Sequence, residues 1–274
     1  MNSIAFAVIV LVLLGLAGGV ILVLASKFMA VYEDPRIAQV TECLAGANCG
    51  GCGYAGCADY AKAIVEQGAP TFKCAPGGQK STDAINAIMG TQGGEQIPMR
   101  ANVLCNGGEN CGKRFEYRGI QTCAAAAAVA GGPTACTFGC LGLGDCTRAC
   151  QFDAIHVSST GVAVVDRAKC TGCSACTTAC PRHIIEMKPL TKTPAVLCSN
   201  KEKGPAVMKA CKTGCIACGM CVRNCPSQAV VLKDNVAVID YTKCTGCGTC
   251  VAKCPKKVIH WVDGKPAVAE PTEA

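Results

Sequence analysis

The apolar positions of this chain form one long run followed by many short segments. Residues 4–25 contain no charged residue and no proline. A helix rising 1.5 Å per residue would span ~33 Å over this run, enough for a hydrocarbon core of ~30 Å. Lys27 and Arg36 follow the run and nothing basic precedes it, so the positive-inside rule predicts a single membrane helix over residues 1–26 with the rest of the chain in the cytoplasm. The alternative is a cleaved signal peptide, but the run lacks a basic first region and is longer than usual.

After this run the pattern predicts short elements between turns. We expect a polar linker over residues 26–42 and helices over Ala58–Glu66, Asp83–Met89 and Cys123–Ala130. The strand-like segment 162–166 recurs at 236–240, and each copy precedes a cysteine run. An internal repeat of this kind predicts duplicated small α+β domains rather than one large core.

Cysteine content decides what those small domains are. The chain has 26 cysteines and only 3 histidines in 274 residues. Such a chain is either a disulfide scaffold or a metal protein, and tight C-x-x-C runs that end in Cys-Pro favour metal ligation by thiolates. The formal charge of +7 counts the cysteines as neutral. Five oxidised [4Fe–4S] centres at roughly −2 each would reverse its sign, so the charge does not indicate nucleic-acid binding.

The C-terminal part carries the most specific motif. Two consecutive runs have the spacing C-x2-C-x2-C-x3-C-P, which is typical of two-cluster bacterial ferredoxins. In that motif three close cysteines hold one cluster, and the fourth holds the other cluster. The crossing predicts one centre on Cys215, Cys218, Cys221 and Cys254, and a second on Cys244, Cys247, Cys250 and Cys225.

The preceding module resembles this one with looser spacing. Cys170, Cys173, Cys176 and Cys180 keep the regular run, whereas its partner has wider gaps and Gln151 in place of proline. The same crossing predicts one centre on Cys136, Cys140, Cys146 and Cys180, and another on Cys170, Cys173, Cys176 and Cys150.

The first cysteine unit has a different spacing, C-x2-C-x4-C-x16-C. Its members are Cys49, Cys52, Cys57 and Cys74. Four cysteines without histidine are compatible with zinc or with an iron–sulfur cluster. The glycines around them would let backbone amides turn towards sulfur, which favours a cluster.

Six cysteines remain outside these five centres. They are Cys43, Cys105, Cys111, Cys123, Cys198 and Cys211. Four of them could hold a sixth cluster, or they could be buried free thiols packing as small hydrophobic residues. We expect no catalytic side chain, and we find no dinucleotide-binding fingerprint.

The chain resembles the B subunit of the Rnf complex, the ion-translocating ferredoxin:NAD oxidoreductase. The resemblance rests on the N-terminal apolar run, the segments Asn48–Cys57 and Cys74–Gly78, and the ferredoxin motifs. The resemblance covers nearly the whole chain. Two ferredoxin modules rather than one make it similar to the longer, polyferredoxin-type form. The family is a translocase component in the prokaryotic plasma membrane.

The resemblance implies a role in electron transport. The protein would accept electrons from reduced ferredoxin and pass them through [4Fe–4S] clusters to membrane flavin and iron–sulfur subunits towards NAD. Its partners would be the A, C, D, E and G subunits of the Rnf complex, reduced ferredoxin and the membrane, with no nucleic acid. Lys253, Lys256 and Lys257 form either a solvated face or a docking patch for an acidic ferredoxin.

Two other functions remain open from the sequence. One is a polyferredoxin subunit of another membrane redox complex, or of a complex that reduces a redox sensor. The other is a protein for cluster storage or assembly. The predicted organisation is a membrane helix (1–26), an N-terminal [4Fe–4S] domain (27–100), a cysteine-containing connector (101–135) and two ferredoxin-like modules (136–190 and 191–274).

Overall fold

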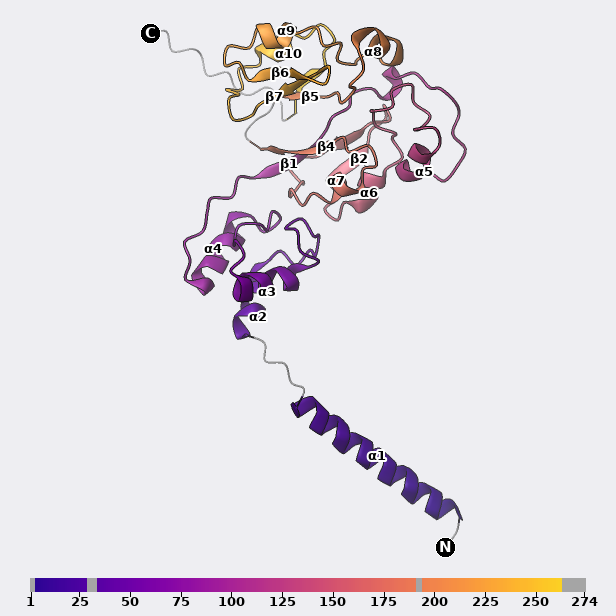
Figure 1. Cartoon of the computed structure of the whole chain (residues 1–274), viewed down its shortest axis with the longest axis vertical. Coiled ribbons are helices and arrows are strands. Elements are labelled where there is room, and N and C mark those ends of the chain that lie inside the picture. Colours follow the sequence, from indigo (N-terminus) through magenta and orange to yellow (C-terminus); the bar gives the residue numbers. More distant parts are fainter. Residues whose placement is uncertain (1–2, 29–33, 191–193, 263–274) are drawn as a thin grey trace.

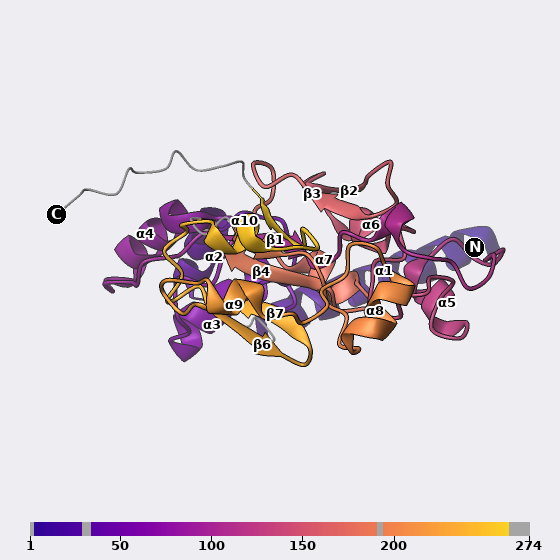
Figure 2. The same ribbon diagram turned by 90° about the horizontal axis from the view of Figure 1, so that it is seen from above.

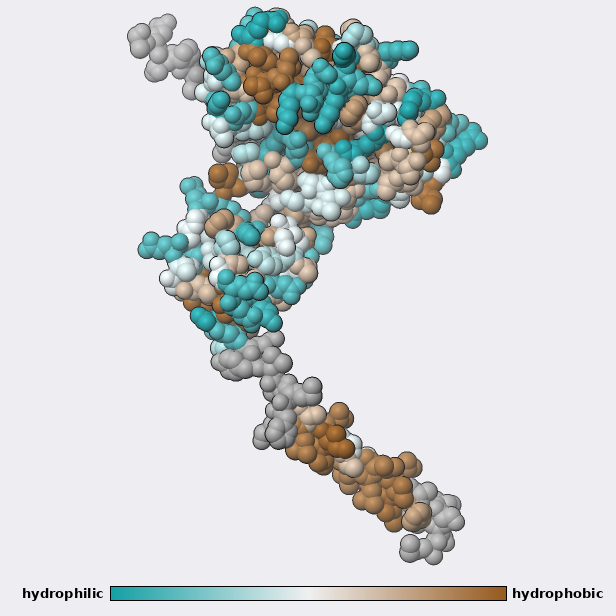
Figure 3. Space-filling view, in the orientation of Figure 1, coloured by the Kyte–Doolittle hydropathy of each residue, from teal (hydrophilic) through white to brown (hydrophobic). Residues whose placement is uncertain are grey.

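A long helix leads into a row of small domains (Figure 1). The computed structural model describes residues 3–28, 34–190 and 194–262. Helix α1 covers Ser3–Phe28, and its segment Val8–Ala25 is long and apolar enough to cross a membrane. No part of that segment is buried against the rest of the described chain, and Figure 3 shows it as a continuous hydrophobic rod. The helix therefore needs lipid or partner helices to cover it.

Three helices build the N-terminal domain: α2 (Pro35–Cys43), α3 (Cys57–Gln67) and α4 (Gly78–Met89). Val40, Tyr60, Ile64 and Ile85 are fully buried between them. The expected linker over residues 26–42 is therefore wrong from Pro35 onward, and residues 29–33 lie outside the described residues. The side chain of Asp34 caps α2 and proline occupies its first turn, two start signals that a reading based on polarity overlooked.

Two other helix boundaries differ from expectation. Helix α4 begins at Gly78, five residues before the expected start at Asp83, so Ser81 lies inside the helix. The Ser81 hydroxyl donates to the Cys43 carbonyl at 2.6 Å and thereby ties α4 to α2. Helix α5 spans Cys123–Ala128, with Thr122 as its N-cap, and ends two residues earlier than expected.

The first ferredoxin-like module is assembled around two antiparallel ribbons. Strand β2 (Ile155–Val157) pairs with β3 (Ala163–Val165), and β1 (Met99–Val103) pairs with β4 (Ile185–Pro189). The short helices α6 (Asp145–Ala149) and α7 (Ala175–Ala179) pack against each other, and a 3-10 turn covers Gly108–Asn110. Strand β1 thus belongs structurally to this module, although it crosses the predicted boundary between the N-terminal domain (27–100) and the connector (101–135).

The second module repeats the arrangement. Strand β6 (Val230–Lys233) pairs with β7 (Val236–Ile239), and β5 (Pro194–Val196) pairs with β8 (Ile259–Trp261). Helices α9 (Met220–Arg223) and α10 (Thr249–Lys253) correspond to α6 and α7, and α8 (Gly204–Ala210) precedes them. The fold class is confirmed: small α+β iron–sulfur-type domains follow one apolar N-terminal helix.

The β1–β4 ribbon lies at the junction of the two modules. In Figure 1 the ribbon runs between α7 of the first module and the strands of the second, and Figure 2 shows the same elements from above. Each module keeps its own small core, and cysteines are prominent members of both cores. The junction therefore brings cysteine-rich surfaces of both modules towards each other.

Candidate metal centres

The same local turn presents cysteines in all four ferredoxin-type runs. A residue with positive φ precedes each short helix: Gly144 (φ 79°), Ser174 (64°), Gly219 (70°) and Gly248 (73°). This left-handed residue turns the chain sharply, so that cysteines on both sides of it face one cavity. In three runs a cysteine directly precedes this residue, and in the fourth the preceding residue is Leu143.

The expected ligands of one C-terminal centre line one cavity. Cys215, Cys218, Cys221 and Cys254 surround it together with apolar side chains. Burial raises the pKa of the Cys221 thiol to about 11. A buried thiol of this kind becomes a thiolate only when a cation replaces its proton, as in metal ligation. We call this group the Cys215 site.

The other C-terminal group, the Cys244 site, consists of Cys225, Cys244, Cys247 and Cys250. Burial raises the pKa of Cys250 to about 11, with further contributions from Cys244 and Cys247. Cys225 lies within electrostatic range of Cys247. The structure therefore brings together the four residues that the crossing rule predicts.

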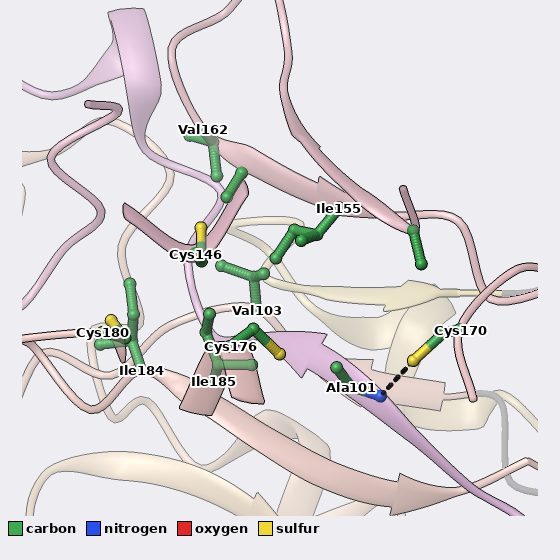
Figure 4. Packing of buried hydrophobic residues seen from close by; sticks show 12 residues of the cluster. Ala101, Val103, Cys146, Ile155, Val162, Cys170, Cys176, Cys180, Ile184 and Ile185 are labelled. Atoms are coloured by element: carbon green, nitrogen blue, oxygen red, sulfur yellow. Dashed lines mark hydrogen bonds between the residues drawn. The ribbon is translucent and has the colours of Figure 1, made fainter. Parts of the chain in front are cut away.

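In the first module, Cys150, Cys170, Cys173 and Cys176 form the Cys170 site. Burial raises the pKa of Cys176 to about 12, and the other three cysteines contribute to that shift. The backbone N–H of Ala101 donates to the Cys170 sulfur at 3.5 Å (Figure 4). Strand β1 thus supplies a hydrogen bond to a cysteine far away in sequence.

The second group of this module, the Cys140 site, differs from the expected set. Its cavity is lined by Cys123, Cys140, Cys146 and Cys180, and Cys136 is absent from it. The spacing explains the difference, because Leu143 occupies the position that Cys218 holds in the second module. Cys123, at the start of α5, takes that place. The Asp145 carboxylate accepts hydrogen bonds from the N–H groups of Cys123 and Ala124, both at 2.9 Å, and so holds α5 against the site.

Cys136 instead lines a cavity between the two modules. We call this the central site, and its cysteines are Cys105, Cys111, Cys136, Cys198 and Cys211. Cys105 and Cys198 follow strands β1 and β5 at equivalent positions, and each accepts an N–H bond, from Cys140 and Cys215 respectively. The thiol of Cys111 hydrogen-bonds to Cys211, which lowers the pKa of Cys211 and raises that of Cys111. Sequence reasoning left four of these cysteines unassigned and grouped Cys136 with Cys140, because the five come from distant parts of the chain.

The N-terminal site consists of Cys49, Cys52, Cys57 and Cys74. Cys52, Cys57 and Cys74 lie at the core of their domain, and the Asn48 side chain accepts the N–H of Cys57 at 2.8 Å. Gly51 lies against the first module: a Cβ atom there would be 2.3 Å from the Cys173 carbonyl oxygen. The N-terminal and Cys170 sites are therefore neighbours across the domain boundary.

The donor sets fit iron–sulfur clusters better than single ions. Within residues 3–28, 34–190 and 194–262, no three His, Cys, Asp or Glu side chains converge on one metal-ion position. A cubane instead needs four cysteine sulfurs spaced around a larger group. Backbone N–H groups also donate to sulfur at equivalent positions: Ala154 to Cys150, Ala229 to Cys225 and Val258 to Cys254, at 3.3–3.4 Å. Such bonds stabilise thiolates and tune the potential of a cluster.

Comparison with known proteins identifies iron–sulfur domains in three parts of the chain. Three family profiles match: a putative Fe-S cluster over residues 44–76, a 4Fe-4S binding domain over 162–185 and a 4Fe-4S dicluster domain over 214–259. The B subunit of the ion-translocating oxidoreductase complex of Methanosarcina acetivorans is 43% identical over 88% of this chain and 90% of its own length. The B subunit of the Na(+)-translocating ferredoxin:NAD(+) oxidoreductase complex of Acetobacterium woodii is 42% identical over 89% of this chain and 73% of its own length.

This chain belongs to the family of B subunits of ion-translocating oxidoreductase complexes. A third member, the B subunit of the proton-translocating ferredoxin:NAD(+) oxidoreductase complex of Clostridium ljungdahlii, is 38% identical over 88% of this chain and 85% of its own length. The expected resemblance is confirmed, as is a set of 4Fe-4S domains behind one apolar helix.

The matched profiles leave part of this B-type chain uncovered. All five cysteines of the central site lie outside residues 44–76, 162–185 and 214–259. Cys43, at the end of α2, packs on the core of the N-terminal domain and lines none of the three cysteine-rich cavities described above. The structure thus identifies the central site through tertiary contacts that local sequence profiles do not contain.

Proposed function

We propose that this chain is the electron-transfer subunit of a ferredoxin:NAD oxidoreductase. It would accept electrons from reduced ferredoxin and deliver them through [4Fe–4S] clusters to membrane partners of the same complex. One observation carries the proposal: the cysteine sites form an uninterrupted row from the second module to the domain next to α1. Relatives named as subunits of ferredoxin:NAD(+) oxidoreductases support the choice of donor and acceptor.

Contacts between successive sites support this row. The N–H of Cys215 donates to Cys198 at 3.4 Å, which joins the Cys215 and central sites. The N–H of Cys140 donates to Cys105 at 3.3 Å, which joins the central and Cys140 sites.

The row continues towards the membrane helix. Cys146 contributes to the pKa shift of Cys176, so the Cys140 and Cys170 sites are adjacent. Gly51 and Cys173 then join the Cys170 site to the N-terminal site. Short steps of this kind suit electron transfer between neighbouring clusters.

With the central site included, we propose six clusters per chain instead of five. Four of its five cysteines are enough for a cubane. Without a cluster there, the two modules would be separated by a cavity lined with five cysteine thiols, and the row would be broken at the module junction. The full proposal is therefore one [4Fe–4S] cluster at each of the six sites.

We place the input of electrons at the second module. Cys218 and Cys247 are the exposed cysteines, and both lie in this module, far from α1. Lys253 and Lys257 are exposed near Cys254, and Lys256 lines the cavity of the Cys215 site. Positive charge beside an accessible ligand suits the weak and fast docking of an acidic ferredoxin.

Charge reversal tests this proposal. Lys253, Lys256 and Lys257 are all replaced by Glu in the full-length protein, and the rate of reduction by ferredoxin is measured over a range of salt concentrations. We expect about a tenfold slower rate at low salt and a weaker salt dependence. Reduction by a small uncharged reductant should be unchanged.

The matched control makes the same charge change elsewhere. Lys62, Lys80 and Lys113 are exposed and lie outside the second module. Their replacement by Glu should leave ferredoxin reduction nearly normal. Equal effects of the two triple variants would show that the docking surface is elsewhere.

A further inference from the structure

A buried lysine connects the two ferredoxin-like modules at the end of the junction away from the central site. Lys188 lies on β4 of the first module and is 8% exposed. Its ammonium group donates to the Tyr241 hydroxyl of the second module at 3.0 Å and lies 5.0 Å from the centre of the Tyr241 ring. Tyr241 in turn donates to the Pro194 carbonyl at 2.9 Å. The contact therefore fixes a cation between the modules.

The strand pattern explains how Lys188 reaches this place. Ile185 and Met187 point into the core of the first module, so Glu186 and Lys188 occupy the opposite face of β4. That face meets the second module. Glu186 is 3.9 Å from the Lys188 ammonium but has a 57% exposed side chain, so solvent weakens this ion pair.

Arg167 adds a second cation beside Lys188. It is 7% exposed and lies three residues before Cys170, just as Tyr241 lies three residues before Cys244. Burial is the main cause that lowers the pKa of Lys188, and the positive charge of Arg167 lowers it further. Two like charges held together out of water are costly unless negative charge lies nearby.

Clusters at the flanking cysteine sites would add negative charge on both sides of this junction. The ribbon that carries Lys188 touches the Cys170 site through its other strand, because the N–H of Ala101 on β1 donates to the Cys170 sulfur at 3.5 Å. Tyr241, which Lys188 contacts, packs on the core that contains Cys250. A cubane with four thiolates is an anion, and its potential depends on the charges around it. This step rests on the proposed function, because it requires clusters at the Cys170 and Cys244 sites.

We propose that Lys188 is a positioning residue that raises the reduction potentials of the clusters at the Cys170 and Cys244 sites together. Adding one electron at either site increases the negative charge beside the ammonium group, which stabilises the reduced form. Tyr241 holds the ammonium group in place. The two modules thereby share one electrostatic control, in addition to the row of sites through the centre.

Redox titration of the full-length protein, followed by electron paramagnetic resonance, tests this inference. Signals are assigned with Cys173→Ser and Cys247→Ser variants. In Lys188→Met we expect the midpoint potentials of both flanking sites to become more negative, with unchanged iron content and an unchanged N-terminal site. Lys188→Arg keeps the charge and should keep both potentials near normal.

An exposed lysine provides the matched control. Lys169 is next to Cys170, and its side chain is 55% exposed. Lys169→Met should give a smaller shift that disappears at high salt, whereas the Lys188→Met shift should persist because the site is buried. If Lys188→Met loses iron, the same potentials are measured in Lys188→Gln, which removes the charge but can still hydrogen-bond to Tyr241. A negative shift at both flanking sites is then expected in that variant.

Several results would overturn the inference. These are unchanged potentials at both flanking sites in an iron-replete Lys188→Met or Lys188→Gln variant, an equal shift in Lys188→Arg, or an equal shift at the N-terminal site. Failure of the proposed function would look different, because the unaltered protein would then lack the iron–sulfur signals altogether.

Discussion

At the scale of single residues, Cys123 compensates for a missing cysteine at position 143. Leu143 stands in its run at the position that Cys218 occupies in the second module. Gly144, the next residue, has the same left-handed conformation as Gly219. The backbone of the turn is therefore intact, and only the sulfur comes from another segment. We therefore expect that the fourth ligand of the Cys140 site can come either from position 123 or from position 143.

This exchange gives a direct prediction. Cys123→Ser should lose one cluster, about four irons per chain. Adding Leu143→Cys to that variant should restore the lost iron, because position 143 lies on the same kind of turn as Cys218. Iron and sulfide analysis of anaerobically prepared protein measures both effects. No iron loss in Cys123→Ser would contradict the grouping of Cys123 with Cys140, Cys146 and Cys180.

Gly51 allows the N-terminal domain to approach the first module closely. The space for a side chain is absent, since a Cβ atom would lie 2.3 Å from a backbone oxygen. Gly51→Val should therefore push the two domains apart while leaving the cysteines in place. We expect slower electron transfer to the N-terminal site at normal iron content, measured by rapid freeze-quench spectroscopy.

A neighbouring exposed position serves as the control for Gly51. Ala55 is exposed in the same loop, and Ala55→Val adds an apolar side chain of the same kind there. Normal transfer in Gly51→Val would mean that this contact does not set the distance between the sites.

The cysteine residues also show how far the sequence alone could go. The expected sets for the Cys215, Cys244 and Cys170 sites agree with the structural groups, because their ligands follow from local spacing and one crossing. The N-terminal set is likewise local. The spacing predicts Cys136 beside Cys140, because a four-residue distance resembles a ligand spacing. The structure places Cys136 near Cys198 and Cys211, a neighbourhood that depends on how the two modules pack.

At the scale of elements, the strands that complete each module come from outside its cysteine motif. β1 pairs with β4 in one module and β5 pairs with β8 in the other. Each outer strand then leads into a cysteine of the central site, Cys105 or Cys198. The segments between the cysteine motifs therefore form part of the modules themselves. Polarity and spacing could not predict this, because the strands have only three to five residues.

Helix α1 is the element with the simplest prediction. Its apolar surface is uncovered by the described domains, and none of the cysteine sites includes it. A chain that starts near Ser26 should be soluble and keep its clusters, as measured by fractionation and iron content. Reporter fusions after Lys27 should indicate the cytoplasmic side. A reporter signal from the opposite side would reverse the proposed topology.

At the scale of the whole molecule, six sites predict the total metal content. Intact protein should contain about 24 irons, four for each cluster, rather than the roughly 20 irons expected from five clusters. Cys105→Ser combined with Cys211→Ser should lower the count by about four and leave the other sites loaded. Zinc as the main metal would contradict the assignment of every site.

The exposure of Cys218 and Cys247 has a consequence for survival outside anaerobic conditions. Oxidants react first with accessible sulfur and with the metal that it holds. Damage by air should therefore begin at the second module and proceed inward, while the more deeply enclosed cysteines of the first module are spared for longer. After brief aeration the protein would keep most of its clusters but lose those of the second module. Electron input would therefore stop before the rest of the row is damaged.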